Sequence, residues 1–200
     1  MGKDLYEKRN SNYCYKNSNV LINKLDIHNE KVLQKFEAKI TAAKLLALRK
    51  KGIIGNFDTQ HLIDIHTYLF EDIYPFAGKF RNENIAKGVF RFAEFEYIEP
   101  ELERLLNELK SENYLKGLSK EDLTQRLAYY LSELNVLHPF REGNGRTIRE
   151  FIRELALENG YVLNLSNVSP SDFLKASIKS IVDTTDLSNL IAVCLQQKST

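Results

Sequence analysis

A stretch of twelve residues gathers the side chains that a phosphate-handling site would need. It runs from His138 to Arg149 and reads His-Pro-Phe-Arg-Glu-Gly-Asn-Gly-Arg-Thr-Ile-Arg. An imidazole can act as a general base near neutral pH, a carboxylate can hold a divalent cation, and guanidinium groups pair with phosphate oxygens. No other segment of the sequence combines a histidine, a carboxylate, a glycine-framed loop and two arginines within such a length.

The flanking residues predict a loop between two helices. His138 closes an apolar periodic run, and a residue before a proline is disfavoured in an α-helix, so that helix should end at His138. Apolar residues recur at helical spacing over 146–158, and Asn159-Gly160 is a C-terminal signal. Between the two helices, Gly143-Asn144-Gly145 can turn successive N–H groups inward at a helix N-terminus, where phosphate is favoured.

Charged residues complete the predicted phosphate site. Arg146 and Arg149 lie three positions apart and share a helix face, and Glu142 is the kind of single oxygen ligand that Mg²⁺ takes beside phosphates. Each feature also has a purely structural interpretation. The histidine could cap the helix, the glycines could form an ordinary turn, and the arginines could pair with Glu150 and Glu154 in solvent. Their convergence in one segment favours a site that binds a polyphosphate.

The segment matches the pattern His-Pro-Phe-x-(Asp/Glu)-Gly-Asn-Gly-Arg-x-x-Arg without a gap. The chain therefore resembles the Fic domain, a family of helical enzymes most of which transfer AMP from ATP to a protein hydroxyl. The resemblance extends through 68–78 and 87–93, and with the motif it covers most of 57–160. It implies an all-α fold, a Fic-type bundle of about seven helices with one short β-hairpin flap. It also implies ATP and Mg²⁺ as cofactors.

The resemblance implies a role for each motif residue. His138 would be the catalytic base that takes the proton from a Tyr, Ser or Thr hydroxyl of a target protein, and Glu142 would hold Mg²⁺. Pro139 and Phe140 would be structural, with Phe140 anchoring the loop in the core. The phosphates would be bound by the backbone of the glycine loop, by the Asn144 side chain and by the two arginines, a set that comprises Gly143, Asn144, Gly145, Arg146 and Arg149.

Residues 88–92 alternate in character and include aromatic β-formers, which predicts a short strand or hairpin. As a structural feature alone it would cover the core. The resemblance makes it a flap over the active site, whose exposed edge binds an extended segment of the target by strand addition. The target-docking flap would comprise Lys87, Gly88, Val89, Phe90, Arg91 and Phe92, and Phe90 or Phe92 could clamp aliphatic groups of the target.

Composition indicates one domain over residues 1–200, with 43% apolar residues and no stretch suited to a membrane span or a secretory signal. We expect a soluble, cytoplasmic protein. A net charge of +1, from 28 basic and 27 acidic side chains, gives little attraction to nucleic acid or to an anionic membrane. Cys14 and Cys194 are expected to be ordinary thiols in a reducing compartment.

Spacing and capping signals predict the elements around the motif. Residues 1–28 should form an irregular arm that packs on the core, with contact to the nucleotide base as an alternative. His61 and His66 are expected to have surface or packing roles. Helices are predicted over 29–51, from Asp58 to before Tyr74-Pro75, from Glu99 with Pro100 at the first position, from Ser119 to His138, from Ser169 onward, and over about 187–196.

One departure from the family concerns regulation. Many Fic proteins carry the pattern (Ser/Thr)-x-x-x-Glu-(Gly/Asn), whose glutamate pairs with the second motif arginine, here Arg149. Only Thr67 and Glu71 have this spacing, and Asp72 follows them. Either a small antitoxin supplies the glutamate, or the chain ends before an inhibitory helix. Both alternatives predict that this chain alone binds ATP and modifies itself, and a toxin system could deliver it to another cell.

Other functions remain open on the sequence. A Fic-type enzyme could use another phosphate donor, for phosphorylation or phosphocholine transfer. A helical interaction module could keep a nucleotide pocket without catalysis. Nucleic-acid binding by residues 141–153 is disfavoured, because Glu142, Glu150 and Glu154 interleave the arginines.

Overall fold

Capping side chains start four of the helices. The computed structural model describes residues 11–53, 55–88 and 90–198. Asn29, Asp58, Ser119 and Ser169 each accept a hydrogen bond from the backbone N–H three residues later, and the last three were predicted to start helices. These bonds satisfy N–H groups that have no partner within the helix.

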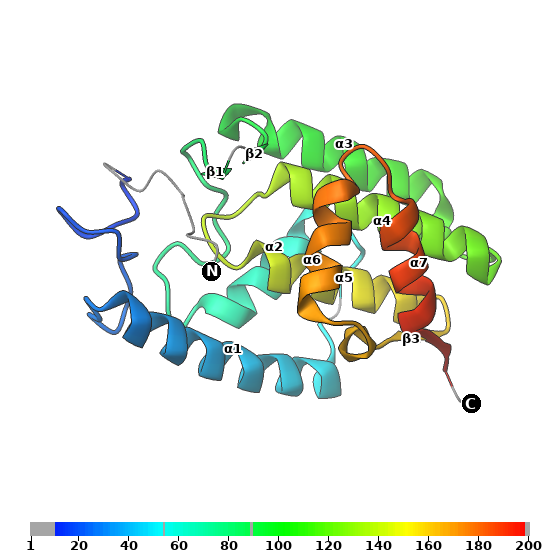
Figure 1. The fold of residues 1–200 in the computed structure, drawn as a ribbon, viewed down its shortest axis with the longest axis horizontal. Helices are drawn as coiled ribbons and strands as arrows, with labels where there is room; N and C mark the ends of the chain where they lie inside the picture. The colour runs from blue at the N-terminus through cyan, green and yellow to red at the C-terminus, as the bar shows by residue number, and fades with distance from the viewer. Residues whose placement is uncertain (1–10, 54, 89, 199–200) are drawn as a thin grey trace.

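The described residues contain seven α-helices, which confirms the predicted fold class (Figure 1). Three short 3-10 helices connect them: η1 (Phe95–Tyr97), η2 (Asn113–Leu115) and η3 (Leu165–Asn167). The α-helices are α1 (Glu30–Lys51), α2 (Thr59–Phe70), α3 (Ile98–Ser111), α4 (Lys120–Leu137), α5 (Asn144–Glu158), α6 (Pro170–Lys179) and α7 (Thr185–Cys194).

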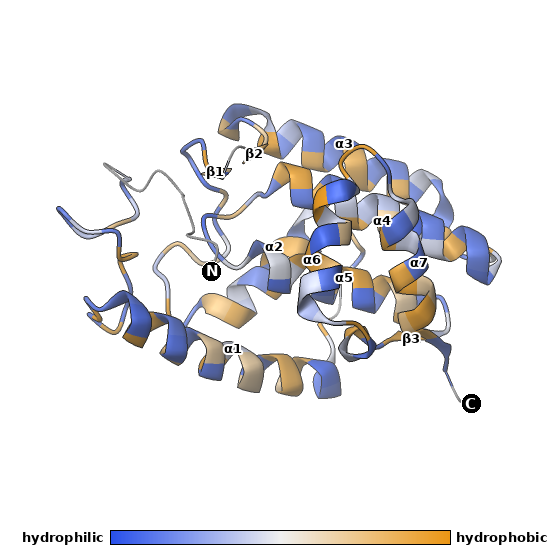
Figure 2. Ribbon diagram, viewed as in Figure 1, coloured by the Kyte–Doolittle hydropathy of each residue, from blue (hydrophilic) through white to orange (hydrophobic). Residues whose placement is uncertain are grey.

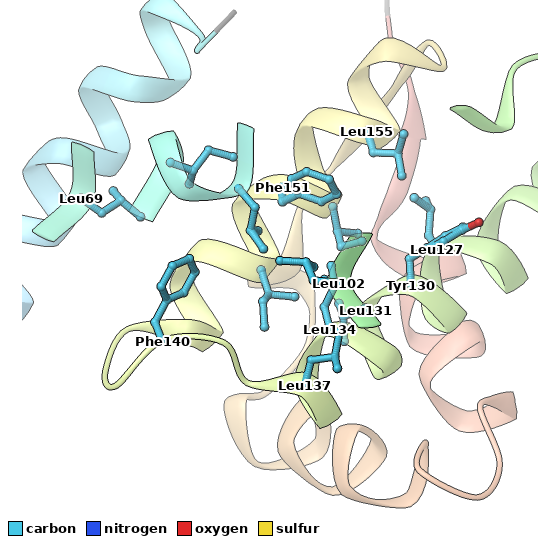
Figure 3. Close-up of a cluster of buried hydrophobic side chains, with 14 of the residues drawn as sticks. Leu69, Leu102, Leu127, Tyr130, Leu131, Leu134, Leu137, Phe140, Phe151 and Leu155 are labelled. Atoms are coloured by element: carbon cyan, nitrogen blue, oxygen red, sulfur yellow. The ribbon is translucent and has the colours of Figure 1, made fainter. Parts of the chain in front are cut away.

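Helix α4 lies at the centre of the molecule and packs against α3, α5 and α7, while α2 packs on α5. Polar and apolar residues alternate along the helices, which places apolar side chains on one shared core (Figure 2). Leu127, Leu131 and Leu134 of α4 are completely buried there. Figure 3 shows Phe140 entering this core from the loop between α4 and α5, where its ring is also completely buried. The loop is thus fixed to the core at its first residues.

Two small antiparallel sheets complete the fold. The predicted flap is present as β1 (Ala86–Lys87) and β2 (Phe90–Arg91), with Lys87 opposite Phe90. Val89 lies outside the described residues. The flap lies beside the loop between α4 and α5 in Figure 1, and Ala93 N–H donates to Val136 O at 3.1 Å.

The second sheet was not predicted. Strand β3 (Tyr161–Leu163) pairs with β4 (Leu195–Gln197), and the prediction that the last helix reaches Gln196 was wrong. The backbone turns extended at Leu195, because there it pairs with a strand 32 residues earlier and buries Leu195 beside Leu163. Such a tertiary contact overrides a helical pattern at a helix end.

The start of α3 also differs from the prediction. The helix begins at Ile98, so Pro100 is its third residue rather than its first. Proline is tolerated there because N–H groups of the first turn have no acceptor within the helix.

The described residues of the N-terminal arm contact the helical core. Cys14 and Leu21 form a bridge and are buried, and Lys24 N–H donates to Ile73 O at 2.8 Å. Residues 1–10 of the predicted arm lie outside the described residues. Over the described ranges, no helix combines the length and the apolar character needed to cross a bilayer.

Candidate active site

The loop that follows α4 begins with a left-handed residue. His138 has φ 47° and ψ 59°, and its N–H donates to Leu134 O, so α4 ends there as the following proline predicts. Non-glycine residues seldom adopt this conformation, and it persists only where the surroundings impose it. We refer to residues 138–146 as the motif loop.

Asn144 locks the motif loop internally. Its Oδ1 accepts a hydrogen bond from Phe140 N–H at 2.8 Å, and its Nδ2 donates to Phe140 O at 2.7 Å. The side chain is buried, and each of its two polar atoms makes a hydrogen bond within the loop. A contribution of Asn144 to phosphate binding would therefore come from its backbone N–H, rather than from the side chain as the sequence suggested.

The start of α5 offers backbone N–H groups without partners. Gly143 adopts φ 83° and provides no side-chain cap. The N–H groups of Asn144 and Gly145 donate to no acceptor within the described ranges. The N-terminal dipole of a fifteen-residue helix points at the same place. These features are those of an anion-binding nest.

The two motif arginines differ in their partners. Arg146 binds Glu37 of α1 and Thr41 Oγ1, the latter at 3.1 Å, and its guanidinium lies over the Phe70 ring. Arg149 makes no hydrogen bond or ion pair with the residues that the structure describes. It lies over the nest, because a Cβ added at Gly145 would be 3.0 Å from its NH1. Burial, followed by the charge of Arg146, lowers the pKa of Arg149.

An arginine-lined cavity adjoins the nest. Its volume is about 240 Å³, and Arg49, Arg146, Arg149 and Arg153 contribute to its wall. Only Glu150 provides a carboxylate among the residues that line it. Glu150 pairs with Arg49 and Arg153, and Glu37 pairs with Arg146, so Arg149 is the arginine of this wall without a carboxylate partner among the described residues.

Glu142 fits the role of a single magnesium ligand. Its side chain is 32% exposed, and its Oε1 accepts from Gly143 N–H at 2.9 Å, while Oε2 accepts no hydrogen bond within the described part of the chain. Burial, and then the nearby carboxylate of Glu37, raise the pKa of Glu142. A bound cation would relieve both effects. The described residues hold no group of three or more His, Cys, Asp or Glu side chains that could bind a metal ion.

The imidazole of His138 is held in one orientation. Its Nδ1 lies 3.2 Å from Asn135 O, so a proton on Nδ1 would donate there and leave the Nε2 lone pair free. The ring stacks on Phe92 of the flap at a centroid distance of 3.8 Å. Burial lowers the pKa of His138 to about 3, and the charges of Arg81 and Lys87 act in the same direction, against the opposing bond to Asn135. The ring is therefore neutral at pH 7.

The flap meets the motif loop through its aromatic residues. Phe92 contacts His138, and Phe90 packs edge-on against Phe92 at 5.1 Å. Lys87, Gly88 and Arg91 are exposed. The structure thus brings the predicted base, nest, carboxylate and flap to one side of the bundle.

His66 is a supporting residue that the sequence did not identify beyond packing. It is buried, its Nδ1 accepts from Gly78 N–H at 2.8 Å, and its Nε2 donates to Glu142 O at 2.9 Å. Its ring also stacks on Phe140 at 3.8 Å. It therefore holds the backbone that carries the proposed metal ligand. Glu37 was missed in the same way, since both act on residues that are distant in the sequence.

Comparison with known proteins agrees with the geometry of this site. The sequence pattern of the Fic/DOC family matches residues 56–156. The chain is 39% identical to protein adenylyltransferase VbhT of Bartonella schoenbuchensis over 182 residues, which are 91% of this chain and 38% of the length of VbhT. It is 36% identical to the "Probable protein adenylyltransferase Fic" of Salmonella typhimurium over 181 residues, which are 90% of this chain and 88% of that protein.

A solved structure with a bound nucleotide has the same fold. The N-terminal Fic domain of a VirB-translocated Bep effector protein from Bartonella quintana, with bound ADP, superposes with a TM-score of 0.87 at 29% identity. The match covers 94% of this chain and 96% of that domain.

Proposed function

Since the chain belongs to the Fic/DOC family, we propose that it is a protein adenylyltransferase, which transfers AMP from ATP to a Tyr, Ser or Thr hydroxyl of a target protein. The observation that carries this proposal is the combination of a neutral imidazole and an unpartnered N–H nest on one short loop. Two relatives bear the name of this activity, and a related domain binds ADP. The chain spans 38% of the length of VbhT, so the proposal covers the reaction of this chain and not other activities of the whole of VbhT.

The reaction would need one proton transfer and one displacement at phosphorus. His138 Nε2 takes the proton of the target hydroxyl as that oxygen attacks the α-phosphorus, and the bond to the departing pyrophosphate breaks. General base catalysis of this kind contributes roughly 10²- to 10⁴-fold. With a pKa of about 3 in the free protein, His138 is a weak base, but the negative charge of a bound triphosphate would raise that value.

The remaining site residues would stabilise negative charge. The N–H groups of Asn144 and Gly145 would contact phosphate oxygens, and Arg146 and Arg149 would bind the pyrophosphate end. Glu142 would hold Mg²⁺, which when bound neutralises charge on the phosphates. Because these groups are fixed before the substrate arrives, they need little reorganisation during the reaction.

The flap would recognise the target. Its strands are two residues long, and Arg91 on β2 is exposed, so an extended target segment could add to the edge of the hairpin. Main-chain pairing would give affinity with little side-chain selectivity.

Regulation would act on Arg149. Its guanidinium has no partner among the described residues, so a glutamate supplied by a small antitoxin could bind it and displace the nucleotide. Without such a partner, the chain would bind ATP and modify itself. We place its action in the cytoplasm, either of the producing cell or, for a toxin system, of a recipient cell.

The test uses ATP labelled at the α- or the γ-phosphate, incubated with the purified chain, Mg²⁺ and a cell lysate. Adenylyl transfer predicts protein labelled from α-labelled ATP and not from γ-labelled ATP. Label from the γ-phosphate alone would instead show phosphorylation. ATP binding without any label would show a non-catalytic nucleotide-binding module.

A further inference from the structure

Arg81 lies in the loop between α2 and the flap, and the proposed reaction does not use it. Only 2% of its surface is exposed, although an arginine is seldom buried so completely. Its guanidinium donates to four backbone carbonyls, those of Glu83, Ala93, Leu137 and His138. Burying a charge costs free energy, so an arginine at this place must do more than fill space.

Two of the four carbonyls close the end of α4. Arg81 Nε donates to His138 O at 2.8 Å, and its Nη2 donates to Leu137 O at 3.1 Å. Carbonyls in the last turn of a helix lack an intrahelical partner, and a positive charge is favourable there. The Arg81 backbone N–H donates to Pro139 O at 2.9 Å. Arg81 therefore holds three successive carbonyls, with the proposed base in the middle.

The other two carbonyls belong to residues that flank the flap, one before it and one after it. Nη1 donates to Glu83 O at 2.8 Å, and Nη2 donates also to Ala93 O. Phe92, which precedes Ala93, stacks on the His138 ring. One side chain thus ties both ends of the flap to the residue that would accept the proton.

We propose that Arg81 is a positioning residue, which fixes the His138 imidazole relative to the flap so that a docked hydroxyl meets the base. This inference rests on the proposed function. A planar guanidinium with five donors can serve four carbonyls at once, whereas the compact ammonium of lysine cannot reproduce this fork. The charge of Arg81 adds a second effect. With Lys87, it is one of the two charged groups that lower the pKa of His138 beyond the larger effect of burial.

The test compares Arg81→Gln and Arg81→Lys with Arg104→Gln as the control. Arg104 is also an arginine, but it is 55% exposed on α3 and pairs with Glu101 and Glu108 of its own helix. A small displacement of a catalytic group can cost about 100-fold in rate, so we expect a fall of this order in the transfer rate for Arg81→Gln. Arg81→Lys should show a smaller fall. The ATP dissociation constant should stay within about twofold of wild type in all three variants.

A second readout follows the His138 ring directly. The chain has four histidines, so their ring signals can be assigned in an NMR titration. Removing the positive charge in Arg81→Gln should raise the pKa of His138, and the acidic limb of the pH–rate profile should move upward with it. Arg81→Lys keeps the charge, so it should leave the pKa in place while transfer falls. If Arg81 only supported the fold, the loss of transfer and the change in the pKa of His138 would occur together in both variants.

Wild-type transfer together with a wild-type His138 pKa in folded Arg81→Gln would overturn the inference. A loss of ATP affinity as large as the loss of rate would also overturn it, since it would indicate general collapse of the site. If Arg81→Gln does not fold, an unchanged transfer rate in Arg81→Lys would overturn the inference. If the wild-type chain labels no protein, the proposed function fails; a pKa of His138 that still rises in Arg81→Gln would then show that Arg81 acts on the ring, whereas an unchanged pKa would overturn the inference as well.

Discussion

The motif loop and the flap meet at His138, but their backbones are held in different ways. Within the motif loop, Phe140 is buried, Asn144 bonds it through two buried hydrogen bonds, and His66 holds the carbonyl of Glu142. The flap has two strands of two residues each, and Lys87, Gly88 and Arg91 are exposed.

This difference matches the demands that the two regions would meet. A cradle for phosphates stabilises charge best when its donors are fixed in advance. A docking edge must leave main-chain groups accessible to a partner. We therefore expect substitutions in the motif loop to affect folding and nucleotide binding, and substitutions in the flap to affect target recognition with little change in stability.

The largest effect should come from glycine substitutions that test the two regions in parallel. In Gly143→Ala, the new Cβ would lie 2.3 Å from a Phe70 ring carbon, at a residue with φ 83°. Backbone strain and overpacking together predict a loss of about 3 kcal/mol in the free energy of unfolding and a loss of ATP binding. In the control Gly88→Ala, at φ 61° in the flap turn, the Cβ meets no atom within 4 Å. Only strain of about 1 kcal/mol remains there. Urea denaturation measures both variants, and equal losses in the free energy of unfolding would contradict the proposed difference between the motif loop and the flap.

The two asparagines offer a second contrast. Asn144→Ala leaves the N–H and the carbonyl of Phe140 buried without partners, which predicts a destabilisation of about 2 kcal/mol. Near the flap, exposed Asn84 accepts one hydrogen bond from Phe95 N–H, and Asn84→Ala should cost about 0.5 kcal/mol. Thermal unfolding of both variants measures the difference. The idea of a locked loop fails if the Asn144 variant is no less stable than the Asn84 variant.

The buried His66 predicts a pH dependence of stability. Burial lowers its pKa to about 4, so between about pH 6.5 and pH 4 the unfolded chain binds a proton that the folded chain excludes. Stability should therefore fall as the pH drops through this window, by as much as about 2 kcal/mol at pH 5 from this residue. His66→Gln should flatten the decline, as measured by urea midpoints between pH 7 and pH 5. Parallel curves for the two proteins would show that His66 does not contribute.

The smallest effect on folding is expected in the flap. Arg91→Pro removes one main-chain N–H from β2, while Arg91→Ala removes the same side chain and keeps the N–H. Loss of one hydrogen bond to the target predicts about a tenfold lower rate of target modification for the proline variant alone. ATP affinity should be the same for both. Full-rate modification by folded Arg91→Pro would end the strand-addition proposal.

Much of the scaffold could be predicted because its signals are local. Asp58, Ser119 and Ser169 start helices through bonds to residues three positions away. His138 and Pro139 likewise stop α4 by their own backbone preferences. Such features need no knowledge of the tertiary fold.

The supporting residues could not be predicted in this way. His66 reaches Glu142 across 76 positions, and Glu37 reaches Arg146 across 109. Neither pair has a sequence spacing that indicates contact. The sheet formed by β3 and β4 was missed for the same reason, since its pairing depends on how α6 and α7 return the chain to the end of α5. The motif indicated which residues could act, whereas the fold showed which residues hold them.

The most direct test of the account measures nucleotide binding and transfer in the same preparation of His138→Ala. The account predicts an ATP dissociation constant close to that of wild type, because the nest and both arginines are retained, together with no detectable label from α-labelled ATP on the target. Labelling at the wild-type rate by the alanine variant would contradict the assignment of His138 as the base.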